Sequence, residues 1–284
     1  MLQEERVINP TFTSHGSALE SGYAAAMLRI AARFCGPPES GNGGYCAGAL
    51  AHQFLSATGT STAVEVTLRK PPPLERPLDF ELDGGQATLK DAGELIAEAR
   101  SASLSLVPPR PPSFERASQL SKLYVGHFRH HFPKCFVCGP ARAEGDGLRI
   151  FPGSQHTDEP VAAPWVPAAS LANADGRLDT ALLWAALDCT GYFAVGASDY
   201  PMALLGRMTA RVEGPIAVGE PCVVTGFALG REGRKMYAGT ALYGSDGSRR
   251  ALSFQTWILV GGSVPPPPDS IRSLRRPSSG GFKI

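Results

Sequence analysis

Two stretches of the chain decide the fold: residues 64–77 read VEVTLRKPPPLERP, and residues 208–221 read MTARVEGPIAVGEP. In each stretch a strand-like run ends at a proline, and a second proline precedes another strand-like run. The prolines of the first stretch, Pro71 and Pro77, recur in the second at a spacing of 144 residues. A repeat close to half the chain in length predicts two copies of one domain-sized unit, not a solenoid.

The composition is that of an ordinary globular protein. Of the 284 residues, 43% are hydrophobic and 19% are charged, so each of two domains can bury a core. The formal net charge of +1 gives no electrostatic reason to expect nucleic acid or an anionic membrane as the main partner. No apolar run approaches the ~20 residues that span a bilayer, and the polar start MLQEER is unlike a secretory signal. Six scattered cysteines indicate a reducing compartment, so we expect a cytoplasmic protein.

Both halves show the same order of elements, a helix followed by strands. In the first half a glycine-rich loop, residues 40–44, precedes a short apolar helix over residues 45–55. In the second half we expect a helix over 177–194 that is apolar nearly all round, and such a helix is buried. The expected strands of the first half are 63–69, 78–82, 86–90 and 95–107; those of the second half are 148–151, 161–165, 204–212, 222–229, 235–243 and 249–260.

A buried helix followed by an antiparallel meander predicts a sheet wrapped around a helix, and the repeat predicts two such units. We therefore expect an α+β chain with an N-terminal unit over 1–115 and a C-terminal unit over 116–262. Residues 263–284, which contain a run of four prolines, are expected to form a flexible tail. Because the paired units still leave outer sheet surface uncovered, we also expect the chain to form a homodimer.

This order of elements resembles the hotdog fold, and the tandem pair resembles a double hotdog with two antiparallel sheets, each around a central helix. The resemblance covers about residues 33–260. Three residues of the second half carry it further: Asp188 in the central helix, Thr209 in the next strand and Gln255 in the last strand. An Asp, a Thr and a Gln in these elements are similar to the catalytic set of the acyl-CoA thioesterase II family.

The resemblance departs from that family next to the threonine. Arg207 and Met208 stand where the family usually has an Asp-His pair. The stretches CFVCG at 135–139 and LDCTG at 187–191 look more like a thioesterase-like branch of that superfamily. The resemblance implies a hydrolase of lipid metabolism that acts on acyl-CoA or a related acyl thioester without a cofactor.

The chemistry of thioester hydrolysis explains why such residues would be needed. A carboxylate in an apolar helix, as at Asp188, is partly desolvated, which raises its pKa and its basicity toward a water molecule. Thr209 and Gln255 would hydrogen-bond the same water and fix its approach. The backbone N–H groups of the loop before the first helix, with Asn42, Gly43 and Gly44 as candidates, would hold the oxyanion.

Other interpretations of the same residues remain open. Asp188 could end its helix or pair with an arginine, and the glycine-rich loop could be only a tight connection. A groove without an activated water would make the chain an acyl-binding module instead of an enzyme. A hotdog hydratase would need an Asp/His pair, for which His52 is the one candidate histidine, and ranks last. When the two halves are aligned, the first half has His52, Glu65 and Ser101 at the positions of the three site residues. It lacks an equivalent catalytic set, so we expect one active site per chain.

The cysteine pair Cys135 and Cys138 has the C-x-x-C spacing and follows three histidines, His127, His130 and His131. A zinc site usually needs four ligands, and a second C-x-x-C is missing. We therefore expect no metal site, although the nearby histidines leave ligation open. Cys189 beside Asp188 has no histidine near it in the sequence and is interpreted as a packing residue.

Overall fold

A computed structural model describes residues 26–196 and 201–263 of the chain. Apart from Ser263, the tail expected over 263–284 lies outside the described residues. The first half contains β1 (Ala26–Arg29), α1 (Gly43–Thr58), β2 (Ala63–Leu68), β3 (Pro77–Asp83), β4 (Gln86–Asp91) and β5 (Glu94–Ala102). The second half contains α2 (Phe114–Ser121), β6 (Val161–Trp165), α3 (Thr180–Val195), β7 (Pro201–Val212), β8 (Cys222–Glu232), β9 (Lys235–Tyr243) and β10 (Arg249–Ser263).

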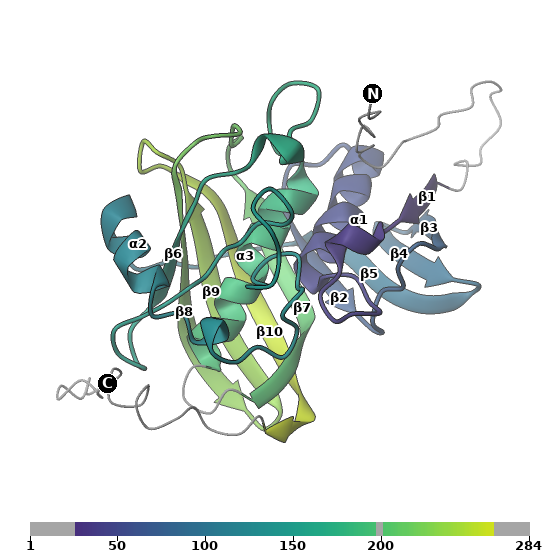
Figure 1. Ribbon diagram of the computed structural model, residues 1–284. Coiled ribbons are helices and arrows are strands. Elements are labelled where there is room, and N and C mark those ends of the chain that lie inside the picture. The colour runs from purple at the N-terminus through teal and green to yellow at the C-terminus, as the bar shows by residue number, and fades with distance from the viewer. Residues whose placement is uncertain (1–25, 197–200, 264–284) are drawn as a thin grey trace, which may run out of the picture.

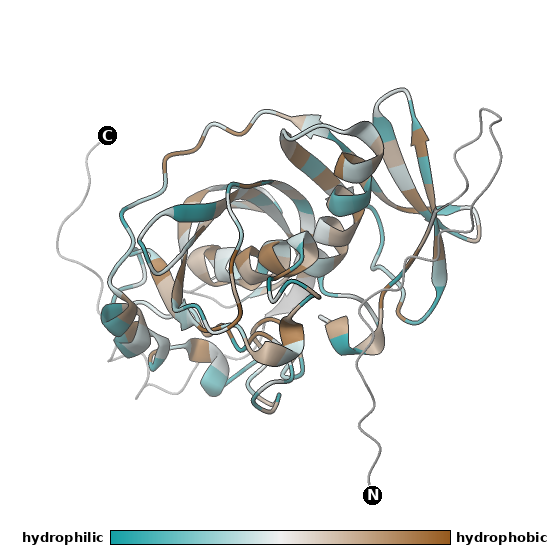
Figure 2. Ribbon diagram, turned by 90° about the horizontal axis from the view of Figure 1, so that it is seen from above, coloured by the Kyte–Doolittle hydropathy of each residue, from teal (hydrophilic) through white to brown (hydrophobic). Residues whose placement is uncertain are grey.

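The strands form one continuous antiparallel sheet in the order β1-β3-β4-β5-β2-β7-β10-β9-β8-β6. The two halves meet where β2 pairs with β7, so the sheets of the two halves join edge to edge. This confirms the large antiparallel sheet that the sequence predicts, with the two longer helices, α1 and α3, packed together on one face (Figure 1). Seen from above, the sheet curves around these helices (Figure 2).

The helix boundaries follow from capping. The Asn42 side chain accepts a hydrogen bond from the Tyr45 N–H, which starts α1, and Gly59 ends it with a φ of 66°. We expected the second helix to begin at Arg177, but α3 begins at Thr180, after Asp179 at its N-cap. Arg177 is instead held in a β-bridge to Ala217, which delays the helix by three residues.

Two expected strands differ in the structure. Residues 148–151 form no strand, because Arg149 has a φ of 52° and the N–H groups of Leu148 and Ile150 donate to residues 136 and 137 instead of the sheet. The strand expected over 95–107 ends at Ala102, where the chain leaves the sheet. Beyond that point Leu104 and Leu106 pack on the outer face of the second half, against Ala241, Tyr243 and Leu252.

Alternating burial places the core on the helix side of the sheet. Val64, Val66, Met208 and Ala210 are buried there with the apolar residues of α1 and α3. The helix α3 is buried along nearly its whole length, as its sequence predicts. No helix within 26–196 or 201–263 is long and apolar enough to cross a membrane.

Candidate active site

The site is built where the first turn of α1 crosses the middle of α3. A Cβ atom on Gly44 would lie 2.4 Å from the Asp188 Cβ, and one on Gly48 would lie 2.6 Å from the Trp184 Cβ. Both distances are far below van der Waals contact, so only glycine allows the helices to approach this closely. The N-terminus of α1 thereby comes within hydrogen-bonding reach of Asp188.

Asp188 is a buried residue, 2% exposed, and the two oxygens of its carboxylate differ in their hydrogen bonding. Its Oδ2 accepts a hydrogen bond of 2.7 Å from the Asn42 side-chain amide and one of 3.0 Å from the Gly44 N–H. Its Oδ1 is buried and has no hydrogen-bond partner among the described residues. Burial raises the pKa of Asp188 to about 7, against the opposing effect of the hydrogen bonds from Gly44 and Asn42. The group is therefore more basic than an exposed aspartate.

A cavity of about 70 Å³ lies beside this carboxylate. One wall is apolar and comes from α3, β7 and β10; the other comes from the start of α1 and the segment 130–138. The cavity is lined by Gly36, Pro37, Asn42, Gly43, His130, His131, Phe132, Cys135, Cys138, Asp188, Cys189, Tyr192, Phe193, Ala203, Leu204, Leu205 and Trp257.

Gln255 lies on the helix side of the sheet, and its amide is fully engaged. Its Nε2 donates to the Leu187 carbonyl at 2.8 Å, and its Oε1 accepts from the Trp257 Nε1 at 2.9 Å. A Cβ on Gly191 would lie 1.9 Å from that Oε1, so α3 sits directly on this amide. Gln255 therefore anchors the turn of α3 that carries Asp188, and is not among the cavity-lining residues.

Thr209 lies on the opposite face of the sheet. Its neighbours Met208 and Ala210 are in the core, so Thr209 points away from the helices, with its Oγ1 3.5 Å from a carboxylate oxygen of Glu65. The structure does not bring Thr209 together with Asp188, and the predicted convergence of the three side chains on one water does not occur. Leu205 lines the cavity instead, because a register shift beside Gly206 changes which residues of β7 face inward.

The three residues of the expected oxyanion loop are divided between two tasks. Asn42 and Gly44 bind the Asp188 carboxylate. Gly43 is the first residue of α1 and lines the cavity; its N–H donates to no described residue in the hydrogen bonds of the structure. The first N–H groups of a helix have no intrahelical acceptor, so the Gly43 N–H is the candidate donor for an oxyanion.

Three buried cysteines surround the other side of the cavity. Cys135 and Cys138 lie next to Cys189 of α3, and the Cys135 and Cys189 sulfurs are 3.7 Å apart. Hydrogen bonds from the Cys138 and Cys189 thiols hold the pKa of Cys135 well below its usual value, whereas burial raises the pKa of Cys138. The sequence missed this cluster because Cys189 is 54 residues from Cys135; only its place on the same buried helix as Asp188 could have indicated it.

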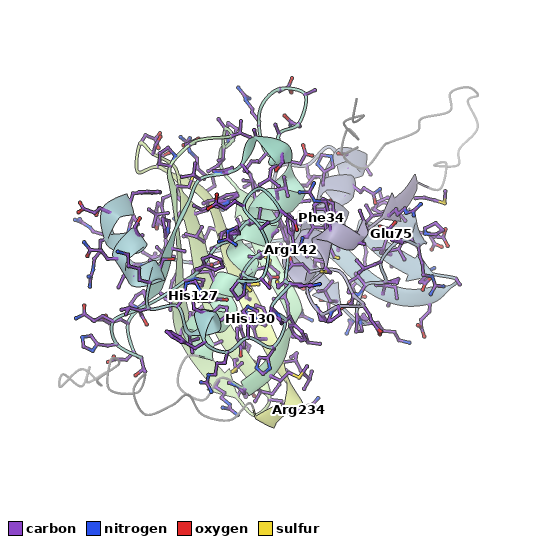
Figure 3. All side chains as sticks on the ribbon, in the orientation of Figure 1. Phe34, Glu75, His127, His130, Arg142 and Arg234 are labelled. Atoms are coloured by element: carbon purple, nitrogen blue, oxygen red, sulfur yellow. The ribbon has the colours of Figure 1, made fainter. Side chains whose placement is uncertain are left out.

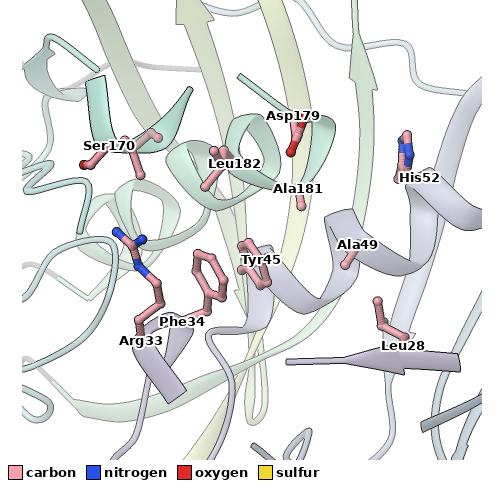
Figure 4. A pocket seen from close by; sticks show the side chains of 11 residues that line it. Leu28, Arg33, Phe34, Tyr45, Ala49, His52, Ser170, Asp179, Ala181 and Leu182 are labelled. Carbon is pink, nitrogen blue, oxygen red and sulfur yellow. The ribbon is translucent and has the colours of Figure 1, made fainter. Parts of the chain in front are cut away.

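A second cavity, of about 100 Å³, lies near the start of α3 and is lined by residues of both halves (Figure 4). His52, which the alignment of the two halves matches with Asp188, lines it together with Arg33, Tyr45 and Asp179. This cavity has no buried carboxylate like Asp188 among its lining residues. The two cavities therefore differ chemically.

Solved structures share this architecture. A "putative thioesterase" from Novosphingobium aromaticivorans has a TM-score of 0.61 at 13% identity, covering 86% of this chain and 98% of that one. A tesB protein from Mycobacterium avium subspecies paratuberculosis has a TM-score of 0.58 at 14% identity, covering 86% and 96%. A protein of unknown function with hot dog fold from Alicyclobacillus acidocaldarius has a TM-score of 0.51 at 12% identity, covering 84% and 92%.

The chain has a hotdog fold. No family model matches the sequence, and no curated protein matches it. The resemblance to thioesterase II-like proteins is thus confirmed at the level of the fold. The function has to be argued from the site itself.

Proposed function

We propose that the chain hydrolyses a thioester, with acyl-CoA or a related acyl carrier as substrate. The observation that supports this proposal is the unequal hydrogen bonding of the Asp188 carboxylate. Its Oδ2 accepts hydrogen bonds from two donors, and its Oδ1 has no hydrogen-bond partner among the described residues. A carboxylate fixed in this way keeps one oxygen available to accept a proton beside the cavity. The thioesterase names of the structural neighbours are consistent with this chemistry.

In the proposed reaction Asp188 Oδ1 takes a proton from a water molecule as the water oxygen attacks the thioester carbonyl. The carbonyl electron pair moves to its oxygen, and the Gly43 N–H donates to the resulting oxyanion. Collapse of this intermediate breaks the carbon–sulfur bond, and the thiolate leaves with the proton returned by Asp188. A carboxylic acid and a free thiol are the products.

The other predicted site residues do not contact the reacting atoms in this mechanism. Gln255 is a positioning residue, because it holds the Leu187 carbonyl next to Asp188. Asn42 and Gly44 orient the base. Thr209 has no part in the reaction, because it faces the other side of the sheet.

We further propose that the chain is a double hotdog, with units over 1–115 and 116–262. The pairing of β2 with β7 and the packing of α1 on α3 support this division. The active site then lies between the units, since the oxyanion donor belongs to the first and the base to the second.

The test is a thiol-release assay over a panel of acyl-CoA chain lengths, with Asp188→Asn as the variant. Because a positioned base contributes roughly 10²–10⁴-fold in rate, this variant should lose turnover by that factor while its affinity for acyl-CoA changes little. Asp179→Asn, at the N-cap of the same helix and in the lining of the other cavity, is the matched control and should keep its activity.

Two outcomes contradict the proposal. Acyl-CoA binding without thiol release by the unchanged protein would favour the non-catalytic binding module. Equal turnover by the unchanged protein and Asp188→Asn would remove Asp188 as the base.

A further inference from the structure

The side-chain cluster formed by Cys135, Cys138 and Cys189 has the form of a metal site. The three sulfur atoms lie within 4.8 Å of one another, and all three residues are buried. They come from two separate segments, a loop and α3, that pack together. All three are free thiols.

The spacing of the sulfurs fits one tetrahedral ion. Zinc–thiolate bonds of about 2.3 Å at tetrahedral angles place two sulfurs about 3.8 Å apart. The Cys135 and Cys189 sulfurs are 3.7 Å apart. Two thiols at this separation are therefore already at ligand spacing without any movement of the backbone.

Hydrogen-bond donors lie around the sulfurs, where they would stabilise the thiolates that form when a metal ion binds. The Asn42 Nδ2 lies 3.8 Å from the Cys135 sulfur and 4.0 Å from the Cys189 sulfur. The His130 Nε2 lies 3.3 Å from the Cys138 sulfur (His130 is labelled in Figure 3). Metal-bound sulfurs are commonly supported by donors of this kind.

We propose that Cys135, Cys138 and Cys189 bind one thiophilic divalent ion, of which Zn²⁺ is the fitting example, in a site that the thioester chemistry above does not require. His130 is a supporting donor and not a fourth ligand, because its Nδ1 accepts the Phe132 N–H at 2.9 Å, which places the ring proton on Nε2. All three cysteines are among the residues that line the cavity beside Asp188, so we place the fourth coordination position on the side of that cavity.

The site would fasten the segment 130–138 to α3. This segment supplies one wall of the cavity, and its Phe136 N–H donates to the Cys35 carbonyl of the first half. An ion bound by both segments would therefore hold the wall in place against the helix that carries Asp188.

The experiment measures metal directly and not activity. The full chain is purified with a reductant, stripped with a chelator, and titrated with Zn²⁺ and with Co²⁺. We expect one ion per chain, and for Co²⁺ the intense near-ultraviolet absorption of thiolate-to-metal charge transfer together with the visible bands of a tetrahedral ion. Cys189→Ser should lose at least tenfold in affinity and weaken the thiolate band.

Cys222→Ser is the matched control, because Cys222 is equally buried but lies in β8 away from the cluster. It should bind Zn²⁺ as the unchanged protein does. If Cys189→Ser fails to fold, the unchanged protein still decides the matter, because an ion that binds only the folded chain raises its Tm further as the free ion concentration rises. No binding of either ion, or a Co²⁺ complex without a thiolate band, would overturn the proposal, as would a disulfide within the cluster in the reduced preparation.

Discussion

Gly43 is the first residue of α1, a position where proline is tolerated because the N–H has no intrahelical acceptor. Gly43→Pro therefore removes the proposed oxyanion donor and keeps the helix, and Asn42 already has the extended backbone that a residue before proline adopts. We expect a loss of roughly 10²–10³ in kcat, the usual effect of removing one such donor. Thiol release under single-turnover conditions measures it.

The control for this substitution is Gly43→Ala, which adds the side chain but keeps the N–H. A Cβ at this position lies 3.0 Å from the Leu205 Cβ, so both variants crowd the cavity wall to a similar degree. Equal activity of the two variants would show that the N–H has no catalytic role.

At the residue scale the sequence identifies the site residues that lie in or next to a helix. It fails for a strand residue, whose role depends on which face of the sheet its side chain occupies. Asp188 could be found because a lone carboxylate in an apolar helix is conspicuous, and Asn42 and Gly43 because they precede a helix. Thr209 was placed on the wrong side because side chains alternate along a strand, so a shift of one residue moves a side chain to the other face. Thr209 alternates with the apolar residues Met208 and Ala210, so the alternation itself places its side chain away from the helices.

The contact between α1 and α3 depends on two glycines with different neighbours. Gly44→Ala would push its methyl group into Asp188, and Gly48→Ala would push it into Trp184. Overpacking of this kind costs about 1–3 kcal/mol of stability, so both variants should unfold at lower denaturant concentration. Only Gly44→Ala should also lose most of its turnover, because it displaces the carboxylate and crowds the N–H that holds it.

Chemical denaturation and thiol release on the same preparations measure both effects. Gly48→Ala is the internal control, since it separates helix packing from the placement of the base. Retained turnover in Gly44→Ala would mean that α3 moves as a whole without disturbing Asp188.

At the element scale the strands of the second half, apart from the one expected over 148–151, were predicted closely, because turns rich in glycine separate the last three of them. The departures occur where tertiary contacts compete with local preference. Residues 104–106 have the alternation of a strand, yet they leave the sheet and cover its outer face. Among the described strands the short β1 pairs with β3 alone, and four residues are too few to give a clear pattern.

The repeat in the sequence has a direct counterpart in the whole molecule. Glu65 and Thr209 are 144 residues apart, the same spacing as the repeated prolines, and they face each other across the β2–β7 junction. In a two-fold arrangement of repeats, a residue that pairs with its own counterpart lies on the axis. The structure thus pairs, across the β2–β7 junction, two residues that the proline spacing makes counterparts.

The outer face of the sheet leads to a prediction about assembly. Leu104 and Leu106 cover part of it, but the surface around Tyr237 and Phe254 borders an open groove of about 480 Å³. We expect this face to be covered by a second copy, so light scattering at micromolar concentration should give about twice the chain mass of 30.0 kDa. A single species at the chain mass would contradict the expected homodimer.

Separation of the two halves tests the architecture itself. A chain cut at Pro111 leaves the edges of β2 and β7 unpaired, and it exposes the faces of α1 and α3 that bury each other. Unpaired edges and large apolar faces cause aggregation, so each half expressed alone should be insoluble. Co-expression of the halves should restore a soluble complex, because the contacts between them are not covalent.

The control is the full chain cleaved after folding at a protease site inserted at Pro111, which should stay associated in gel filtration. A soluble half with a cooperative unfolding transition would show that the unit folds alone, and that the shared sheet is not needed for its stability.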